Sequence, residues 1–492
     1  MKVKIKHLIC LSGLVLLLSF LLPINVSAAV FGPDSWEQYR LNKTNNPVHG
    51  GSVDETIRKK YPTDNQLRAT PVVVNDTLYI GNHNTGSLQA FNVKSGERLW
   101  KSSAPNWVHS EMIYKDGVLF VGYGNRYYQE NGNRGTGESG VLAVDAETGE
   151  TVWKFDTNGE VMPTPAIHGD NVYITAGDEQ LYGVNRESGE LDWQFDLGSI
   201  VSMSSPVIEG DTLYVGGGGS ADQFHFNAID LASQERVWET EFDQVAAGLD
   251  DVPPVVSETS IYTTALVKAE GDNMYEHMLY EMDKETGEIT HKESLGTGEH
   301  VKNNKSGAPV LQDGTIFVGS PITQKFYAFD TEAKEIKWEY EGGVNKAPPV
   351  AYNEYVYFGN AKGDVFTFEA ESGELVNQMK LGGTLAPAGA IIMNEHYISG
   401  SQDGNVYIQP LEDIRTLSES ELYTGEKSEE FTEVSSDQAN AGDSTSSSEG
   451  SEESSTSSNT TLIIILVVLA LVLFLGIYWY RKNSAKKKPH SK

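Results

Sequence analysis

The stretch Val141-Leu-Ala-Val-Asp-Ala-Glu-Thr-Gly-Glu-Thr-Val-Trp153 recurs along most of the chain. Two close copies end at Trp100 and Trp193, and more divergent copies end at Trp238, His291, Trp338 and Asn377. Aligned on the segments that precede these copies, the chain divides into units of about 40 residues, which is the length range of propeller blades. This period predicts a repeat architecture in which similar units stack against one another.

Each unit has the pattern of a small antiparallel sheet. Most units begin with a small residue, a proline and an apolar run, as in Thr70-Pro-Val-Val-Val74. A polar turn such as Asn75-Asp76 and an alternating apolar strand follow. The repeated stretch then supplies two more strands, and no unit shows helical periodicity, so the sequence predicts an all-β chain. The eight units begin at Pro71, Met112, Pro165, Pro206, Pro254, Pro309, Pro349 and Gly389.

The recurring positions of the stretch have structural interpretations. The central Asp or Asn, such as Asp145, can cap a turn by accepting backbone N–H bonds, and the Gly four residues later suits a left-handed backbone. The small residue two positions before the Asp leaves room for a large ring, which the final Trp supplies. A buried Trp of this kind stabilises by roughly 3–5 kcal/mol, judged from core truncations. We expect structural docking between neighbouring blades from Trp100, Trp153, Trp193, Trp238 and Trp338.

The phrase Ala-x-Asp-x-x-Thr-Gly-x-x-x-Trp resembles the tryptophan-docking motif of the pyrroloquinoline-quinone-like β-propeller repeats. The resemblance covers roughly residues 34–412 and implies an eight-bladed propeller of four-stranded blades. The last unit, Gly389 to Leu411, lacks a fourth strand, and Glu55 to Tyr61 precedes the first unit where an outer strand would sit. We expect this N-terminal segment to complete the eighth blade and close the ring. The segment Trp36 to Arg40 also resembles the lead-in of this family.

Both ends of the chain have features of membrane targeting. Residues 1–28 combine basic residues, an apolar run and a small residue at Ala28, which predicts a secretory signal peptide. Residues 462–480 are uninterruptedly apolar and long enough for a single transmembrane helix, and the basic tail 481–492 predicts a cytoplasmic end. The predicted location is therefore the cell membrane, single-pass, with the body outside the cytoplasm. Between these ends we expect a lead-in and ring-closing strand (29–63), the propeller (64–412) and a disordered Ser/Glu-rich stalk (413–461).

Charge and cysteine content exclude several classes of function. The formal net charge is −32 at pH 7, whereas nucleic-acid-binding proteins carry a basic surface, so we predict no nucleic-acid partner. The one cysteine, Cys10, lies in the predicted signal peptide. The mature chain therefore has no disulfide, no cysteine-based zinc site and no thiol chemistry.

The resemblance also implies an enzymatic alternative. Quinoprotein alcohol dehydrogenases of this fold place a vicinal disulfide over the quinone, bind a calcium ion nearby and use an Asp as base. The mature chain lacks the cysteines and has no CxxCH haem motif. The pair Asp250-Asp251 could bind a cation, or it could be a solvated acidic loop. We predict no catalytic residue and no cofactor; pyrroloquinoline quinone and a divalent cation belong to the alternative, a quinone-dependent oxidoreductase of alcohols or sugars.

The units vary most in loops that share one face. In a four-stranded blade, the loop between the second and third strands and the connection to the next blade open on the same side. Extra residues fall there, and insertions on one face of a repeat array often mark a binding face. Aromatic and Arg side chains are the ones most used to anchor partners. We expect a partner-binding face formed by Trp107, His109, Arg126, Tyr127, Tyr128, Tyr275, His300 and Lys302.

Three interpretations of function remain open from the sequence. The leading one is a membrane-anchored, non-enzymatic binding or assembly scaffold for a protein or a cell-envelope polymer, which the resemblance also implies, because outer-membrane assembly propellers of this repeat family act as scaffolds. The second is the oxidoreductase. The third is a cell-wall or polysaccharide-binding module that uses the same aromatic face. The insertions could also be functionally neutral surface loops.

Overall fold

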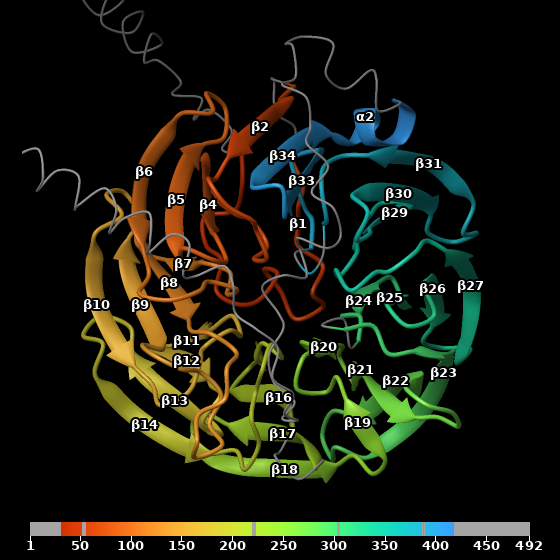
Figure 1. Cartoon of the computed structure of the whole chain (residues 1–492), viewed down its shortest axis with the longest axis horizontal. Helices are drawn as coiled ribbons and strands as arrows, with labels where there is room; N and C mark the ends of the chain where they lie inside the picture. The colour runs from red at the N-terminus through yellow and green to blue at the C-terminus, as the bar shows by residue number, and fades with distance from the viewer. Residues whose placement is uncertain are drawn as a thin grey trace, which may run out of the picture. The chain divides into compact units, whose positions relative to one another are not determined.

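Eight sheets, antiparallel except for the parallel pairing of β1 (Val48–His49) with β32 (Ile391–Met393), stand round a central axis and form a ring (Figure 1). The structure is a computed structural model, and it describes residues 31–51, 56–218, 223–302, 306–385, 387 and 389–417. The predicted eight-bladed propeller of four-stranded blades is confirmed. The predicted signal peptide, the apolar segment 462–480 and the basic tail lie outside the described residues. In the described ranges, no helix is long and apolar enough to cross a membrane.

The blades follow one another in chain order, and we number them from β3 onward. Blade 1 holds β3 (Val72–Val74), β4 (Thr77–Gly81), β5 (Ser87–Asn92) and β6 (Arg98–Ser103). Blade 2 holds β7 (Ile113–Lys115), β8 (Val118–Tyr123), β9 (Gly140–Asp145) and β10 (Thr151–Asp156). Blade 3 holds β11 (Ala166–His168), β12 (Asn171–Thr175), β13 (Gln180–Asn185) and β14 (Leu191–Asp196). Blade 4 holds β15 (Val207–Glu209), β16 (Thr212–Gly218), β17 (Phe224–Asp230) and β18 (Glu235–Glu241).

The second half of the ring has the same plan. Blade 5 holds β19 (Val245–Ala247), β20 (Val255–Val256), β21 (Ser260–Lys268), β22 (Met274–Asp283) and β23 (Ile289–Glu299). Blade 6 holds β24 (Val310–Gln312), β25 (Thr315–Ser320), β26 (Lys325–Asp330) and β27 (Glu335–Glu341). Blade 7 holds β28 (Val350–Tyr352), β29 (Tyr355–Gly359), β30 (Asp364–Glu369) and β31 (Leu375–Lys380). Blade 8 holds β1 (Val48–His49), β32 (Ile391–Met393), β33 (His396–Ser401), β34 (Asn405–Pro410) and β2 (Lys59–Pro62).

The N-terminal strand β2 closes the ring, as the sequence predicts. It pairs antiparallel with β34, with Lys59 opposite Ile408 and Pro62 opposite Asn405. Figure 1 shows β2 at the red end of the colour scale beside β34 at the blue end. Because the first and last parts of the chain share one sheet, the ring has no open junction and the outer edge of β34 is paired.

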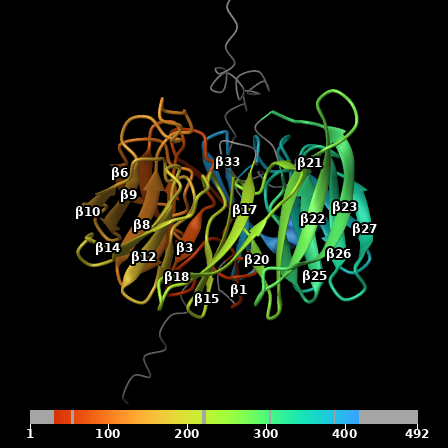
Figure 2. The same ribbon diagram turned by 90° about the horizontal axis from the view of Figure 1, so that it is seen from below.

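The segment Gly32–His49, which we call the belt, runs round one end of the channel. Its backbone or side chains bond to every blade in turn, and this face also carries β1 (Figure 2). Trp36 and Arg40 of the belt are fully buried. The belt therefore covers the end of the channel at which the first and second strands of the blades are joined. Its partners, from blade 1 to blade 8, are Asn75, Tyr114, Ile167, Ile208, Val256, Leu311, Ala351 and Ile392.

Arg40 explains why the eighth unit begins with glycine instead of proline. Its Nε donates to the carbonyl of Asn45 at 2.8 Å and its Nη2 to the carbonyl of Pro349 at 2.6 Å. A Cβ atom on Gly389 would lie 1.9 Å from Arg40 Nη1. The guanidinium thus occupies the space that a side chain would take in the other units.

The Trp side chains that end the repeated stretch lie against the turn of the following blade. Trp100, Trp153, Trp238 and Trp338 donate from Nε1 to backbone carbonyls of the next blade at 2.9–3.1 Å. The rings also cover a glycine of that turn: a Cβ on Gly149, whose φ is 76°, would lie 2.6 Å from the Trp100 ring. Trp193 packs with the apolar cluster that contains Leu213 and Leu231 of blade 4. The four acceptors are Ala146, Arg186, Lys284 and Ala370.

Other residues take over where the repeated stretch departs from its pattern. His291 replaces the Trp of blade 5, and in blade 6 Lys334 stands in the glycine position and pairs with Glu281 of blade 5. In blade 8 the outer strand is β2, and Tyr61 Oη donates to the carbonyl of Val93 in blade 1 at 2.6 Å. The tyrosine thus occupies the role that Trp has elsewhere.

Blade 7 is fastened to a short helix instead of a turn. Asn377 Nδ2 donates to the carbonyls of Ile414 and Leu417 at 2.8 and 3.1 Å. These residues belong to and follow α2 (Leu411–Thr416), in which Leu411 and Ile414 are fully buried. The predicted start of the stalk at residue 413 therefore differs from the structure, in which Asp413–Thr416 belong to α2 and Leu417 accepts a hydrogen bond from Asn377.

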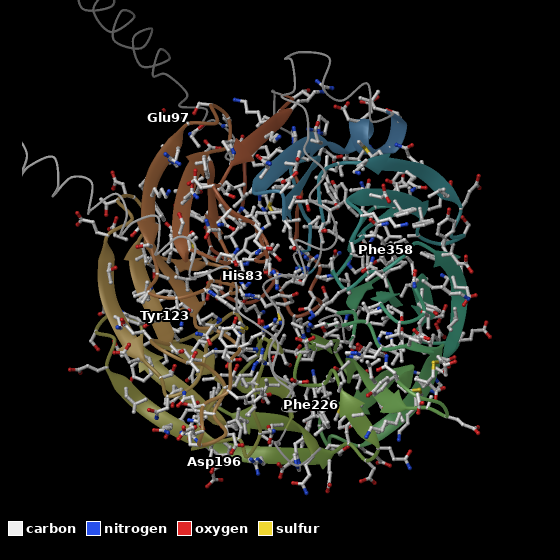
Figure 3. All side chains as sticks on the ribbon, in the orientation of Figure 1. His83, Glu97, Tyr123, Asp196, Phe226 and Phe358 are labelled. Carbon is white, nitrogen blue, oxygen red and sulfur yellow. The ribbon has the colours of Figure 1, made fainter. Side chains whose placement is uncertain are left out.

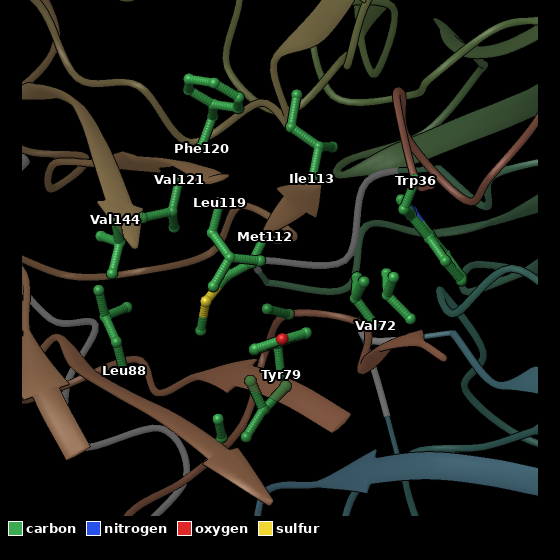
Figure 4. Packing of buried hydrophobic residues seen from close by; sticks show 14 of the residues in the cluster. Trp36, Val72, Tyr79, Leu88, Met112, Ile113, Leu119, Phe120, Val121 and Val144 are labelled. Atoms are coloured by element: carbon green, nitrogen blue, oxygen red, sulfur yellow. The ribbon is translucent and has the colours of Figure 1, made fainter. Parts of the chain in front are cut away.

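Apolar side chains fill the space between neighbouring sheets. Figure 4 shows Leu88 of blade 1 next to Val144 of blade 2, with Leu119 of blade 2 and Tyr79 of blade 1 nearby. These residues alternate along their strands with residues that face the other side of the sheet. The core therefore surrounds the channel and holds the inner ends of the blades at fixed positions.

Candidate functional site

The face opposite the belt carries the longest loops. Figure 2 shows loops of blades 2 and 5 rising at the upper edge, while β1 lies at the lower edge. The β8–β9 loop and the extended strands β21, β22 and β23 account for the additional residues. The candidate site lies on this face, where the channel is not covered by the belt.

Three aromatic residues of blades 1 and 2, Trp107, Tyr127 and Tyr128, form what we call the aromatic row. The rings of Trp107 and Tyr127 lie 5.4 Å apart, edge to face. Tyr127 is 40% exposed and Tyr128 is 64% exposed. The loop is held in place because Gly124 N–H donates to the carbonyl of Trp107 at 3.0 Å and Asn106 Nδ2 to that of Thr136 at 3.2 Å. The row is therefore a pre-formed surface.

The other predicted face residues lie in different places. Tyr275 and His300 of blade 5 have ring centroids 5.6 Å apart, and Lys302 beside them is exposed. This is a second patch, three blades from the aromatic row. Arg126 is partly buried. His109 is buried, with 9% of its surface exposed, and it lines the cavity in the channel.

The channel above the belt narrows to a cavity of about 40 Å³. Most of the residues that line it stand three positions or one position before the start of a unit. Arg68, His109, Asp251 and Lys346 hold the first of these positions, and Glu111 holds the second. We call this group the channel mouth. The remaining lining residues are Tyr39, Thr70, Met162, Thr164, Met203, Ser205, Pro253, Ser306, Ala308, Pro348 and Pro387.

The acidic groups at the channel mouth are largely matched by cations. Lys346 Nζ lies 2.6 Å from Asp251 Oδ2, and both side chains are buried. Arg134 Nε lies 3.1 Å from Glu160 Oε1. The pair Asp250-Asp251 therefore faces a protein cation, and among the described residues no three His, Cys, Asp or Glu side chains are grouped to hold a metal ion.

Glu111 lies between the channel mouth and the belt. Its Oε2 accepts from the backbone N–H of Arg40 at 2.8 Å and from Trp36 Nε1 at 3.3 Å. Burial raises the pKa of Glu111 to about 7, and these hydrogen bonds oppose the shift only in part. The carboxyl group therefore ties the inner end of blade 2 to the belt.

Two histidines meet at the channel mouth. The rings of His83 and His109 are 4.2 Å apart, and the Trp107 ring lies 4.6 Å from His83. Figure 3 shows His83 on the inner side of its blade, toward the centre of the ring. Burial, and then the nearby Arg68, lower the pKa of His83 to about 2, and burial lowers the pKa of His109 well below its usual value. Both imidazoles are therefore neutral at physiological pH.

The quinone implied by the fold family does not fit these residues. Small-molecule sites usually measure about 300–1,000 Å³, whereas the channel mouth encloses about 40 Å³. The carboxylate that would help to hold a calcium ion beside the quinone is already paired with Lys346. We therefore assign no step of chemistry to a quinone in this protein.

Sequence reasoning missed Arg68, His83, Glu111 and Lys346. The signal was present, because three of them align at the positions just before each unit start, where other units have Met, Ser or Thr. His83 lies in the β4–β5 loop, and nothing in its neighbourhood distinguishes it in the sequence.

The repeat, the closed ring of eight blades and the docking Trp residues define the class of protein: a β-propeller of pyrroloquinoline-quinone-like repeats. The family model described as outer membrane protein assembly factor BamB matches residues 51–129, 84–224 and 222–386. The chain belongs to this family.

Several known proteins are similar to this chain. Outer membrane protein assembly factor BamB of Burkholderia pseudomallei is 24% identical over 352 residues, covering 69% of this chain and 83% of that protein. Tetrathionate hydrolase of Acidithiobacillus ferrooxidans is 22% identical over 357 residues, covering 68% of this chain and 70% of the hydrolase. BamB from Moraxella catarrhalis has a TM-score of 0.55 at 20% identity, covering 72% of this chain and 99% of that structure. The quinohemoprotein alcohol dehydrogenase from Comamonas testosteroni has a TM-score of 0.58 at 13% identity, covering 77% of this chain and 80% of that structure.

Proposed function

We propose that this protein is a non-enzymatic assembly scaffold that binds a partner protein through the aromatic row. The observation that carries the proposal is the exposure of Tyr127, whose ring contacts Trp107, and of its chain neighbour Tyr128, on a loop that hydrogen bonds hold in place. Aromatic anchors of this kind supply large contact area at low entropic cost. Membership of the family supports a scaffold function, since the family model carries the description of an outer membrane protein assembly factor.

The proposal includes a membrane anchor. The apolar segment 462–480 and the basic tail that follows favour a single helix with a cytoplasmic end, and residues 1–28 favour export of the body. The propeller would then stand outside the cytoplasm, joined to the membrane through the Ser/Glu-rich segment that follows α2. Cell fractionation with protease protection tests this topology: the body should be accessible from outside and the tail should be protected.

Partner capture tests the binding function. The full chain in detergent is immobilised and compared with a variant that carries Trp107→Ala, Tyr127→Ala and Tyr128→Ala. We expect capture from a solubilised envelope fraction to fall at least about tenfold in this variant, because truncating hot-spot aromatics commonly costs 2 kcal/mol or more.

A matched control changes exposed apolar residues elsewhere on the same blades. Leu99 and Val152 are 48% and 52% exposed on the outer strands of blades 1 and 2. The double variant Leu99→Ala, Val152→Ala should capture the partner as the wild type does. Equal capture by all three proteins would refute the aromatic row as the binding surface, and retention on insoluble glycans instead of protein would favour the polysaccharide-binding alternative.

A further inference from the structure

Arg68 is a cation without a matching carboxylate at the channel mouth. Its Nε is buried and has no hydrogen-bond partner among the described residues. The charged neighbour that acts on it is Arg126, another cation, and burial and this neighbour lower the pKa of Arg68 to about 10. A buried charge without a partner is costly, and proteins retain such a group where a ligand supplies the missing charge.

Imidazole nitrogens without partners lie at the same cavity: His109 lines it together with Arg68, and the His83 ring packs against His109. His109 Nδ1 and Nε2 and His83 Nδ1 are buried and unpartnered in the described part of the chain. A neutral imidazole keeps one N–H, so each of these rings can donate to an oxygen atom. His83 is positioned by its backbone N–H, which donates to the carbonyl of Gln66 at 3.1 Å, two residues before Arg68.

The size and charge of the cavity select the ligand. Its volume of about 40 Å³ admits one small polar group and excludes a ring system. Glu160 and Asp251 are paired with Arg134 and Lys346. The third carboxyl, Glu111, accepts hydrogen bonds from the belt at Oε2, and its Oε1 is buried without a partner. Among the described residues, no carboxylate makes an ion pair or a hydrogen bond with Arg68. A cation would be repelled by Arg68, whereas a planar carboxylate matches a guanidinium fork.

The aromatic row indicates what the carboxylate is attached to. Trp107 contacts both His83 of the channel mouth and Tyr127 of the row, with ring centroids 4.6 and 5.4 Å apart. A polypeptide lying on the row can therefore direct one side chain or chain end into the cavity. The net charge of −32 repels acidic molecules at long range. An acidic group therefore binds only where nearby cations attract it locally.

We propose that the channel mouth binds a carboxylate of a partner polypeptide, with Arg68 as its ion partner and His109, against which His83 packs, as an N–H donor. This inference rests on the proposed function, since it names the chemistry that the scaffold recognises in its partner. Arg68 makes the site selective for an acidic residue or a free C-terminus, and the aromatic row holds the adjoining chain.

Calorimetric titration of the full chain in detergent, at constant ionic strength, tests the proposal with four probes. Acetate, N-acetyl-Gly-Asp-amide and N-acetyl-Gly-Gly with a free C-terminus carry the carboxylate in different ways, and N-acetyl-Gly-Asn-amide is the neutral control. We expect the carboxylate probes to bind and the Asn probe to fail, and the stronger of the two peptides identifies the source of the carboxylate. Equal binding of the Asp and Asn probes, or no binding by any carboxylate, would overturn the proposal.

The variant Arg68→Gln should weaken carboxylate binding at least tenfold, whereas Arg98→Gln, an exposed arginine on the outer strand of blade 1, should leave it unchanged. Without ligand, Arg68→Gln should melt at or above the wild-type temperature, because it removes an uncompensated buried charge. Two results would show that Arg68 has only a packing role. One is that Arg68→Gln binds carboxylates as tightly as the wild type does, and the other is that its melting temperature lies well below that of the wild type.

The same proteins separate this proposal from the proposed function. If Arg68→Gln loses carboxylate binding but captures the envelope partner as the wild type does, the carboxylate inference fails as a statement about the partner and the scaffold function stands. If carboxylates bind but no substitution in the aromatic row changes capture of the envelope partner, the scaffold proposal fails. The channel mouth is then an anion-binding site that is unrelated to this partner.

Discussion

At the scale of single residues, the repeated stretch supplies the contacts that hold neighbouring blades together. Four of the five docking Trp residues, all except Trp193, contact the next blade in two ways: Nε1–H donates to a carbonyl, and the ring covers a glycine. Glycine is required at this position for two reasons: its φ is positive, and a Cβ atom would collide with the Trp ring. The central Asp of the same turn accepts backbone N–H bonds, as Asp145 does from Glu147 and Thr148 at 3.1 and 2.8 Å.

Truncating a docking Trp tests this role. Trp100 is 8% exposed, and Trp100→Ala should lower the free energy of unfolding by about 3–5 kcal/mol, because both the ring contact and the hydrogen bond are lost. Leu99→Ala, at the exposed neighbouring position, should change it by less than about 0.5 kcal/mol. Denaturant unfolding of both variants measures the difference, and equal losses would show that the ring contributes nothing specific.

The buried carboxyl of Glu111 predicts a dependence of stability on pH. Its pKa is raised from 4.5 to about 7 in the folded protein, so the native state holds a proton that the unfolded chain releases. The stabilising effect is complete below about pH 4.5 and is lost as pH rises through about 7. Between pH 5 and 8, wild type should lose roughly 2–3 kcal/mol more than Glu111→Gln, which cannot ionise. Parallel pH profiles for the two proteins would contradict the assignment.

At the scale of elements, two N-terminal segments complete the ring. β2 supplies the outer strand of blade 8, and the belt bonds to the inner strands of all eight blades. The sequence predicted β2 because the last unit was one strand short. It did not predict the path of the belt, because the belt binds largely through backbone groups, which leave no side-chain pattern in the sequence.

Tyr61 tests the closure of the ring. Its hydroxyl donates to Val93 and its ring lies beside Gly96, so it replaces Trp at the junction of blades 8 and 1. Tyr61→Phe should cost about 1 kcal/mol, the net value of one hydrogen bond, and Tyr61→Ala about 3–5 kcal/mol. Thermal or denaturant unfolding resolves the two steps. If Tyr61→Ala were neutral, β2 would not be fastening the ring.

At the scale of the whole molecule, the two faces of the ring differ in structure. The belt seals one end of the channel with Trp36 and Arg40, and the other end opens beside the aromatic row. The repeat predicted the fold and the face on which the long loops lie. It did not predict the channel mouth, since pairs such as Asp251 with Lys346 join residues 95 positions apart in the sequence. Such pairs depend on the diameter of the closed ring, which no single unit encodes.

Site-specific photocrosslinking in intact cells tests the central claim, that the aromatic row is where the partner binds. A photoreactive phenylalanine analogue replaces Tyr128 on the β8–β9 loop or, as a control on the same blade, Glu147 in the exposed β9–β10 turn of the opposite face. The account predicts a discrete protein adduct from position 128 and none from position 147. Adducts of equal yield from both positions, or an adduct from position 147 alone, would contradict it.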